Sequence, residues 1–204
     1  MKKNLYEYIL SSFQPGEPFF YKDLSDFSNL DSTRHQVLKL IREGKLGKYK
    51  NGTFFLPKKS LLGLPPVVST DNVVVSKYIK HKNNVLGYYS GHTFANQIGL
   101  SLQVPMIKEI VTNESKAITR TIVLNNRTFK IRRAKVPVNN DNYKVLQLLS
   151  LLENYKDLID KEVESSKEII RTYAKNNNIS KEDLYKYADN FRISAMKNIK
   201  NLGL

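Results

Sequence analysis

The spacing of apolar residues near the N-terminus is helical. Between residues 5 and 13 apolar side chains recur every three or four positions, which predicts an amphipathic helix. A short apolar step at residues 19–21 and a brief helix over residues 22–27 follow. The next predicted helix has Asp31 and Ser32 at its start, where both can cap free amides.

That capped helix has a clear inner side and a clear end. Val37, Leu40 and Ile41 share one face, which we expect to be buried, and Gly44 ends the helix. Two segments with β-forming residues then flank Asn51-Gly52, a dipeptide typical of a two-residue type I′ turn. Helix, short helix, capped helix and hairpin, in this order, predict a winged helix-turn-helix domain over residues 1–62.

The remaining chain is predicted to form a second domain over residues 67–204. Pro65 and Pro66 mark the boundary. Helices are expected from about Asp71 and over residues 93–98. Between Val104 and Val136 β-branched residues surround turn signals, with Asn125-Asn126 as a second hairpin turn.

The chain past Asp141 is predicted to be helical to its end. Asp141 is expected to cap a helix so apolar that other elements must cover it. Ser180 and Asp183 resemble a capping box that starts one last amphipathic helix, which runs to Leu202. The fold class is therefore α+β, with a winged helix-turn-helix domain followed by a mixed α/β domain that ends in a helical region.

The charge balance points to polyanionic partners. The 204 residues hold 33 lysines and arginines against 19 aspartates and glutamates, a net charge of +14 with a pI near 9.7. Such an excess raises the local concentration of polyanions. Nucleic acid is the first partner expected, an anionic membrane surface the second, and no partner the third.

The absence of cysteine excludes disulfides, thiolate metal sites and cysteine nucleophiles. We read no signal peptide at the N-terminus and no apolar stretch long enough to span a membrane. A cytoplasmic location is expected.

The capped helix and the hairpin carry the candidate DNA-binding residues. The polar side of the helix and the hairpin offer donors to phosphates and base edges. Lysines in the hairpin are expected to position the protein on the phosphate backbone without reading sequence. The candidates are Ser32, Arg34, His35, Gln36, Lys39, Lys48, Lys50, Asn51 and Thr53. A solvated polar face, or a winged helix that contacts only protein, is the alternative.

A second basic block contains no acidic residue between Lys116 and Lys135. Strand alternation predicts Lys130 and Arg132 on one face and Arg133 and Lys135 on the other. An acidic protein, further DNA, or solvent alone remain equal alternatives for this surface. Its candidate residues are Arg120, Arg127, Lys130, Arg132, Arg133 and Lys135.

Signals for catalysis are weak. His35, His81 and His92 lack metal-ligand spacing, and no carboxylate cluster or phosphate-binding glycine loop is present. We therefore expect no enzyme activity, no metal and no cofactor.

Two segments resemble the AbiEi-type antitoxin family. Residues 40–46 (LIREGKL) and 49–57 (YKNGTFFLP) resemble the end of its winged helix. Residues 88–100 (YYSGHTFANQIGL) and 103–105 (QVP) resemble the start of its C-terminal antitoxin domain. Taken together, the resemblance covers nearly the whole chain in the family's order.

The resemblance implies the antitoxin of a bacterial phage-defence, abortive-infection toxin–antitoxin system. In that family the N-terminal domain represses its own operon by binding inverted repeats in the promoter, and the C-terminal domain counters a nucleotidyltransferase-like toxin. The family is type IV, in which no stable toxin complex is required. Inverted repeats imply two copies on DNA, as a dimer or as monomers brought together by the operator.

Two other functions remain open from the residues alone. One is a winged-helix transcription regulator whose C-terminal domain senses a ligand or partner, which a closed pocket would favour. The other is a nucleic-acid-processing enzyme, which would need carboxylates that converge in space.

Overall fold

The chain divides into two compact units, called unit 1 and unit 2 here. The computed structural model describes residues 4–27, 29–50, 52–58, 68–160 and 162–204. Unit 1 ends at Ser76 and unit 2 runs from Lys77 to Leu204. Helices and strands occur in both, which confirms the α+β class. Pro65 and Pro66, the predicted boundary, lie outside the described residues.

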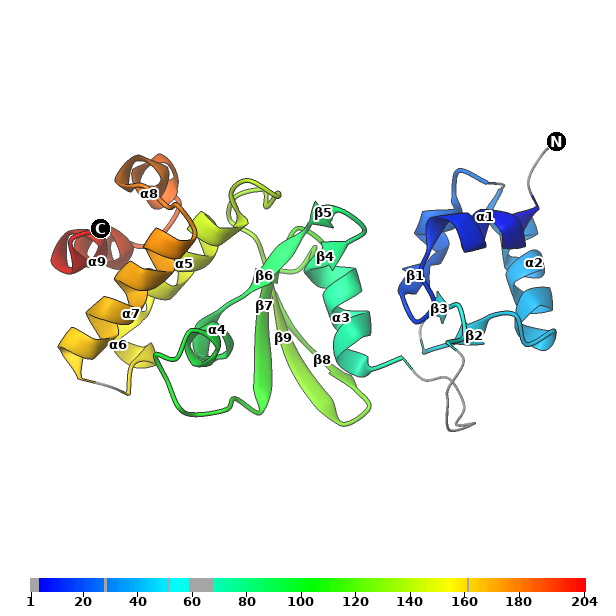
Figure 1. Cartoon of the computed structure of the whole chain (residues 1–204), viewed down its shortest axis with the longest axis horizontal. Coiled ribbons are helices and arrows are strands. Elements are labelled where there is room, and N and C mark those ends of the chain that lie inside the picture. The colour runs from blue at the N-terminus through cyan, green and yellow to red at the C-terminus, as the bar shows by residue number, and fades with distance from the viewer. Residues whose placement is uncertain (1–3, 28, 51, 59–67, 161) are drawn as a thin grey trace. The chain divides into compact units, whose positions relative to one another are not determined.

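Unit 1 combines helices with a small antiparallel sheet whose strand order is β1-β3-β2 (Figure 1). Phe19 pairs with Phe54 between β1 and β3, and Lys48 pairs with Phe54 between β2 and β3. The elements are α1 (Leu5–Ser12), β1 (Pro18–Phe20), the 3₁₀ helix η1 (Tyr21–Leu24), α2 (Leu30–Arg42), β2 (Gly47–Lys48), β3 (Thr53–Phe55) and α3 (Thr70–Tyr78), whose last two residues belong to unit 2.

Helix α2 begins at Leu30, one residue before Asp31, the first of its two predicted capping residues. The Asn29 side chain accepts a hydrogen bond of 2.9 Å from the Ser32 N–H, so Asn29 is the N-cap. The prediction that Asp31 and Ser32 cap the helix is therefore wrong, because a better-placed amide side chain precedes them. Gly44 ends the helix as predicted, with a left-handed φ of +69°.

The predicted hairpin of unit 1 is present, but its turn is longer than expected. The Tyr49 N–H donates to the Thr53 carbonyl at 2.8 Å, which leaves three residues between them instead of two. Gly52, at φ +70°, supplies the left-handed position that three-residue hairpin loops use. The two-residue turn is thus corrected, and Asn51 itself lies outside the described residues.

The core of unit 1 is aromatic. The rings of Phe13 and Phe19 stack with centroids 4.6 Å apart, and Tyr21 meets Phe54 edge-on at 4.8 Å. Val37 is fully buried on the inner face of α2, as predicted from its spacing. This core fixes α2 and the hairpin relative to each other within unit 1.

Unit 2 places a four-stranded sheet beside a group of helices (Figure 1). The helices from α5 onward gather on the β6 side of the sheet, away from β8. The elements are β4 (Lys80–His81), β5 (Asn84–Val85), β6 (Gly87–Tyr89), α4 (Gly91–Gln97), β7 (Ile107–Thr112), β8 (Thr119–Leu124), β9 (Arg127–Arg133), α5 (Tyr143–Glu153), α6 (Tyr155–Leu158), α7 (Val163–Asn176), α8 (Lys181–Ala188) and α9 (Ile193–Leu202).

The strand order of the large sheet is β6-β7-β9-β8, so β9 lies between two strands that precede it. Strand β9 pairs with β7 in parallel and with β8 as a hairpin. Asn125 and Asn126 form the hairpin turn with φ of 45° and 60°, as the prediction of a turn at this dipeptide requires.

Two predictions about the C-terminal helices are wrong. The helix starting at Tyr143 has Asn142, not Asp141, at its N-cap position; the buried Asn142 side chain bonds the Asn139 N–H at 2.9 Å. The last helix is broken into α8 and α9, because Glu153 on α5 accepts the Arg192 N–H at 2.8 Å and anchors a new start. The capping box of Ser180 and Asp183 is confirmed.

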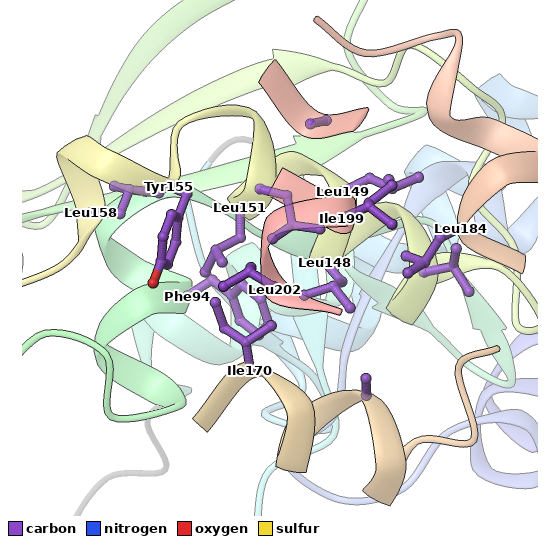
Figure 2. Packing of buried hydrophobic residues seen from close by; sticks show 14 of the residues in the cluster. Phe94, Leu148, Leu149, Leu151, Tyr155, Leu158, Ile170, Leu184, Ile199 and Leu202 are labelled. Atoms are coloured by element: carbon purple, nitrogen blue, oxygen red, sulfur yellow. The ribbon is translucent and has the colours of Figure 1, made fainter. Parts of the chain in front are cut away.

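Helix α5 is the centre of the unit 2 core. Leu148, Leu149, Leu151 and Leu152 are all 0% exposed, as expected for a helix that others must cover. Figure 2 shows side chains from α4, α7 and α9 packed around Leu148, Leu149 and Leu151.

Replacing Leu149 with alanine tests this core. Leu149→Ala leaves a cavity in a close-packed interior, so the free energy of unfolding should fall by about 2–5 kcal/mol. Urea denaturation followed by circular dichroism measures it. The control Leu102→Ala changes a side chain that is 78% exposed and should leave the midpoint unchanged. Equal effects of the two substitutions would contradict the assigned core.

Candidate nucleic-acid interface

The outer face of α2 carries an exposed cationic stripe. Arg34, Leu38 and Arg42 follow one another at four-residue spacing, and all three are exposed. His35 and Lys39 lie beside them and are also exposed. Arg42 and Leu38 are missing from the candidates predicted above, although their spacing from Arg34 places them on the same stripe.

The cations of this stripe have weak, local partners. The Arg34 guanidinium lies 3.3 Å from the exposed Asp31 carboxylate and 5.9 Å from the Tyr21 ring centroid. The Lys39 ammonium is 4.0 Å from Glu43. Exposed ion pairs of this kind contribute little free energy, so a phosphate can replace the carboxylate at low cost.

Glu43 is engaged more closely by Lys45 than by Lys39. The Lys45 ammonium lies 2.8 Å from the Glu43 carboxylate, and the hydrogen bond between them lowers the pKa of Glu43 and raises the pKa of Lys45. Lys45 also lies 5.5 Å from the Tyr6 ring centroid. The Lys39 ammonium is therefore only weakly held and can turn to a ligand.

The other candidates of unit 1 are less uniform. Ser32 and Gln36 are half-buried and bonded to each other, with the Gln36 amide 3.1 Å from the Ser32 hydroxyl. Lys48 and Lys50 are exposed at the hairpin. Thr53 is only 3% exposed on β3, which corrects its place among the surface candidates.

The basic block of unit 2 does not form a single patch. Strand pairing places Lys130 and Arg132 on one face of the sheet, as predicted. Arg120 lies on the opposite face, where its guanidinium donates to the Tyr78 hydroxyl at 3.0 Å. Burial raises the pKa of Tyr78, and the Arg120 charge opposes that rise.

Local contacts divide the block further. Lys135 pairs with Glu153 and lies 4.9 Å from the Phe191 ring centroid. Arg127 and Arg133 are exposed at the two ends of β9. The six predicted cations are thus spread over both faces and the ends of the sheet.

One acidic residue of this region could not be predicted from the sequence. Glu109 on β7 is 14% exposed, 2.7 Å from Arg132 and 3.8 Å from Lys130. It lies outside the basic block in sequence, and the parallel pairing of β7 with β9 brings it there. No local sequence signal indicates such a non-local contact.

A cleft of about 460 Å³ borders Glu109 and Lys130. His92 and the exposed apolar residues Val104 and Met106 line its other side. Among residues 4–27, 29–50, 52–58, 68–160 and 162–204, no cluster of histidine and carboxylate side chains could hold a metal ion. Over the same described ranges, every helix is too short or too polar to cross a membrane.

These features define an α+β protein of two units, with an exposed cationic helix and hairpin on the first. The chain matches DUF6088, a family of unknown function, over residues 6–181, and it belongs to that family. No curated protein matches it.

Removing the Glu109 carboxylate should destabilise unit 2. Glu109→Ala leaves Lys130 and Arg132 facing each other without a counter-charge, so the free energy of unfolding should fall by about 1–3 kcal/mol. Urea denaturation at two salt concentrations measures the loss, which salt should reduce.

The control for that substitution is Glu164→Ala. Glu164 pairs with Lys167 but is 80% exposed, so its removal should change stability little. Equal losses for both variants would show that Glu109 makes no special contribution.

Proposed function

We propose that unit 1 is a winged helix-turn-helix that binds double-stranded DNA, with α2 in the major groove and the β2–β3 hairpin along the backbone. The element order α1-β1-η1-α2-β2-β3 supports this, as does the strand order β1-β3-β2. In such domains the helix before the wing is the recognition helix.

The observation that carries the proposal is the exposed stripe on α2 beside a lysine-bearing hairpin in the same compact unit. Arg34, His35 and Lys39 are exposed and can donate to base edges and phosphates, and Arg42 extends the stripe. Lys48 and Lys50 suit phosphate contacts, which add affinity without sequence preference. Ser32 and Gln36 are secondary, because each bonds the other.

We extend the proposal to the biological role that the AbiEi resemblance implies. The protein is the antitoxin of an abortive-infection system; it represses its own promoter at inverted repeats and opposes a nucleotidyltransferase-like toxin, and it is not itself an enzyme. The support is the resemblance along nearly the whole chain and the separation of unit 2 from the DNA-binding unit.

A winged-helix regulator that senses a ligand is the second candidate. The cleft of about 460 Å³ beside His92 and Glu109 is large enough for a small molecule, although it is open and not the closed pocket that this function favours. The two functions differ in whether the protein relieves the toxicity of a co-expressed toxin.

Gel-shift titration of the full chain tests DNA binding. The probes are its own upstream DNA and a scrambled duplex of equal length, at two salt concentrations. Arg34→Ala and Lys39→Ala should weaken binding to the upstream DNA by about 1–3 kcal/mol if they contact bases. Lys48→Ala and Lys50→Ala should weaken binding to both duplexes, and each should lower the salt slope by about 1.

The matched control is Lys200→Ala, which removes an equal charge from an exposed position on α9. Its binding should equal that of the wild type. If all four unit 1 variants bind like this control, unit 1 does not bind DNA through α2 and the hairpin.

Co-expression with a toxin encoded beside it separates the two activities. The double variant Lys48→Ala/Lys50→Ala should lose repression of a promoter reporter and still relieve growth arrest, since its substitutions lie in unit 1. Simultaneous loss of both activities, with the protein folded, would argue that one surface serves both.

A further inference from the structure

Strand β8 forms an open edge of the unit 2 sheet. It pairs on one side with β9, and within the described part of the chain no strand pairs with its other side. Its register with β9 runs without interruption from Thr119 to Leu124. An edge strand usually carries a bulge, a proline or inward charges that prevent further pairing. This strand has neither bulge nor proline, and its one charged residue, Arg120, is exposed and donates to the Tyr78 hydroxyl.

The alternation of hydrogen-bonded residues along β8 shows which backbone N–H and C=O groups face away from β9. The Arg133 N–H donates to the Ile118 carbonyl at 3.0 Å, immediately before the strand. Bonding positions alternate along an antiparallel pair, so Arg120, Ile122 and Leu124 also bond toward β9. The backbone N–H and C=O groups of Thr119, Thr121 and Val123 therefore point away from the sheet.

The side chains of these three residues are exposed, and Val123 is 65% exposed. They share a face with Lys130 and Arg132 of β9. A strand added beside β8 would lie roughly 10 Å from β9, given the usual strand spacing. Lys130 and Arg132 contact Glu109 on β7, which lies on the side of β9 away from β8, so they act on an added strand through the net positive charge of their face and not by direct contact.

The positive charge near β8 favours an acidic partner at this edge. Lys130 and Arg132 share the Glu109 carboxylate, so their face keeps an excess of positive charge. A second copy paired through β8 would bring together two basic blocks that lack acidic residues from Lys116 to Lys135. Nucleic acid does not use strand edges in this way, whereas extended peptides bond to them through the backbone.

We propose that β8 binds an extended, acidic segment of another protein as an additional strand. Thr119, Thr121 and Val123 bond its backbone, and Lys130 and Arg132 attract its carboxylates. The exposed Ile118, on the opposite face of the sheet, favours a β-branched residue between those carboxylates. This site lies in unit 2 and does not depend on DNA binding by unit 1.

Peptide selection on the immobilised full chain tests the site. A random dodecapeptide library should yield sequences that alternate Asp or Glu with β-branched residues. Fluorescence anisotropy with the enriched peptides then gives dissociation constants. Thr121→Pro removes an outward N–H and no bond to β9, so it should weaken binding at least about tenfold. Arg132→Ala should weaken binding less than Thr121→Pro does, and its effect should be larger at low salt than at high salt.

The matched control is Thr121→Val, which keeps both the N–H and the side-chain shape and should bind within about twofold of the wild type. Val123→Pro repeats the test at the next outward position in case Thr121→Pro does not fold, as judged by circular dichroism.

Several results would overturn the proposal. These are no enrichment, enrichment of sequences without acidic residues, or equal binding to wild type and both proline variants. Self-association of the wild type in sedimentation velocity that Thr121→Pro abolishes would assign the edge to a second copy. Loss of binding to scrambled duplex DNA in Thr121→Pro would assign it to nucleic acid.

Discussion

The parallel pairing of β7 with β9 is the constraint on which unit 2 depends. The chain leaves β7, forms β8 at a distance, and returns through the Asn125-Asn126 turn to place β9 between them. This insertion leaves β8 at the edge with one side unpaired. It also sets Glu109 beside Lys130 and Arg132, residues more than twenty positions later in the sequence. The sheet edge and its charge therefore have the same topological origin.

The free energy needed to break the ion pairs differs between the cations of unit 1 and those of unit 2. Arg34 and Lys39 pair with carboxylates of their own helix at an exposed surface, and such pairs contribute little. Lys130 and Arg132 pair across strands with Glu109, which is 14% exposed. If a phosphate displaced the Glu109 carboxylate from these cations, the carboxylate would be left poorly solvated. This difference favours unit 1 for exchange with DNA phosphates and unit 2 for a fixed protein contact.

Sequence patterns predicted elements best where the determining residues are neighbours. Val37 and Leu40 revealed the buried face of α2, and Ser180 with Asp183 revealed a helix start. Errors came from competing local groups, as where Asn29 caps α2 in place of Asp31. Contacts between distant residues left no signal: Glu153 bonds the Arg192 N–H where the last helix is interrupted, and Glu109 pairs with cations of β9. Thr53 was misplaced because a polar residue in a hairpin can face inward.

The two proposed surfaces bear on the antitoxin role that we propose. A type IV antitoxin needs no stable complex with its toxin, whereas an open β8 edge with uncompensated charge favours one with some acidic protein. A type IV role and a stable complex at β8 are compatible if the segment bound at β8 belongs to a protein other than the toxin. If the proposed toxin itself supplies the segment, the proposed antitoxin is not of type IV. Any effect of that partner on DNA affinity must then be matched by an equal effect of DNA on partner affinity.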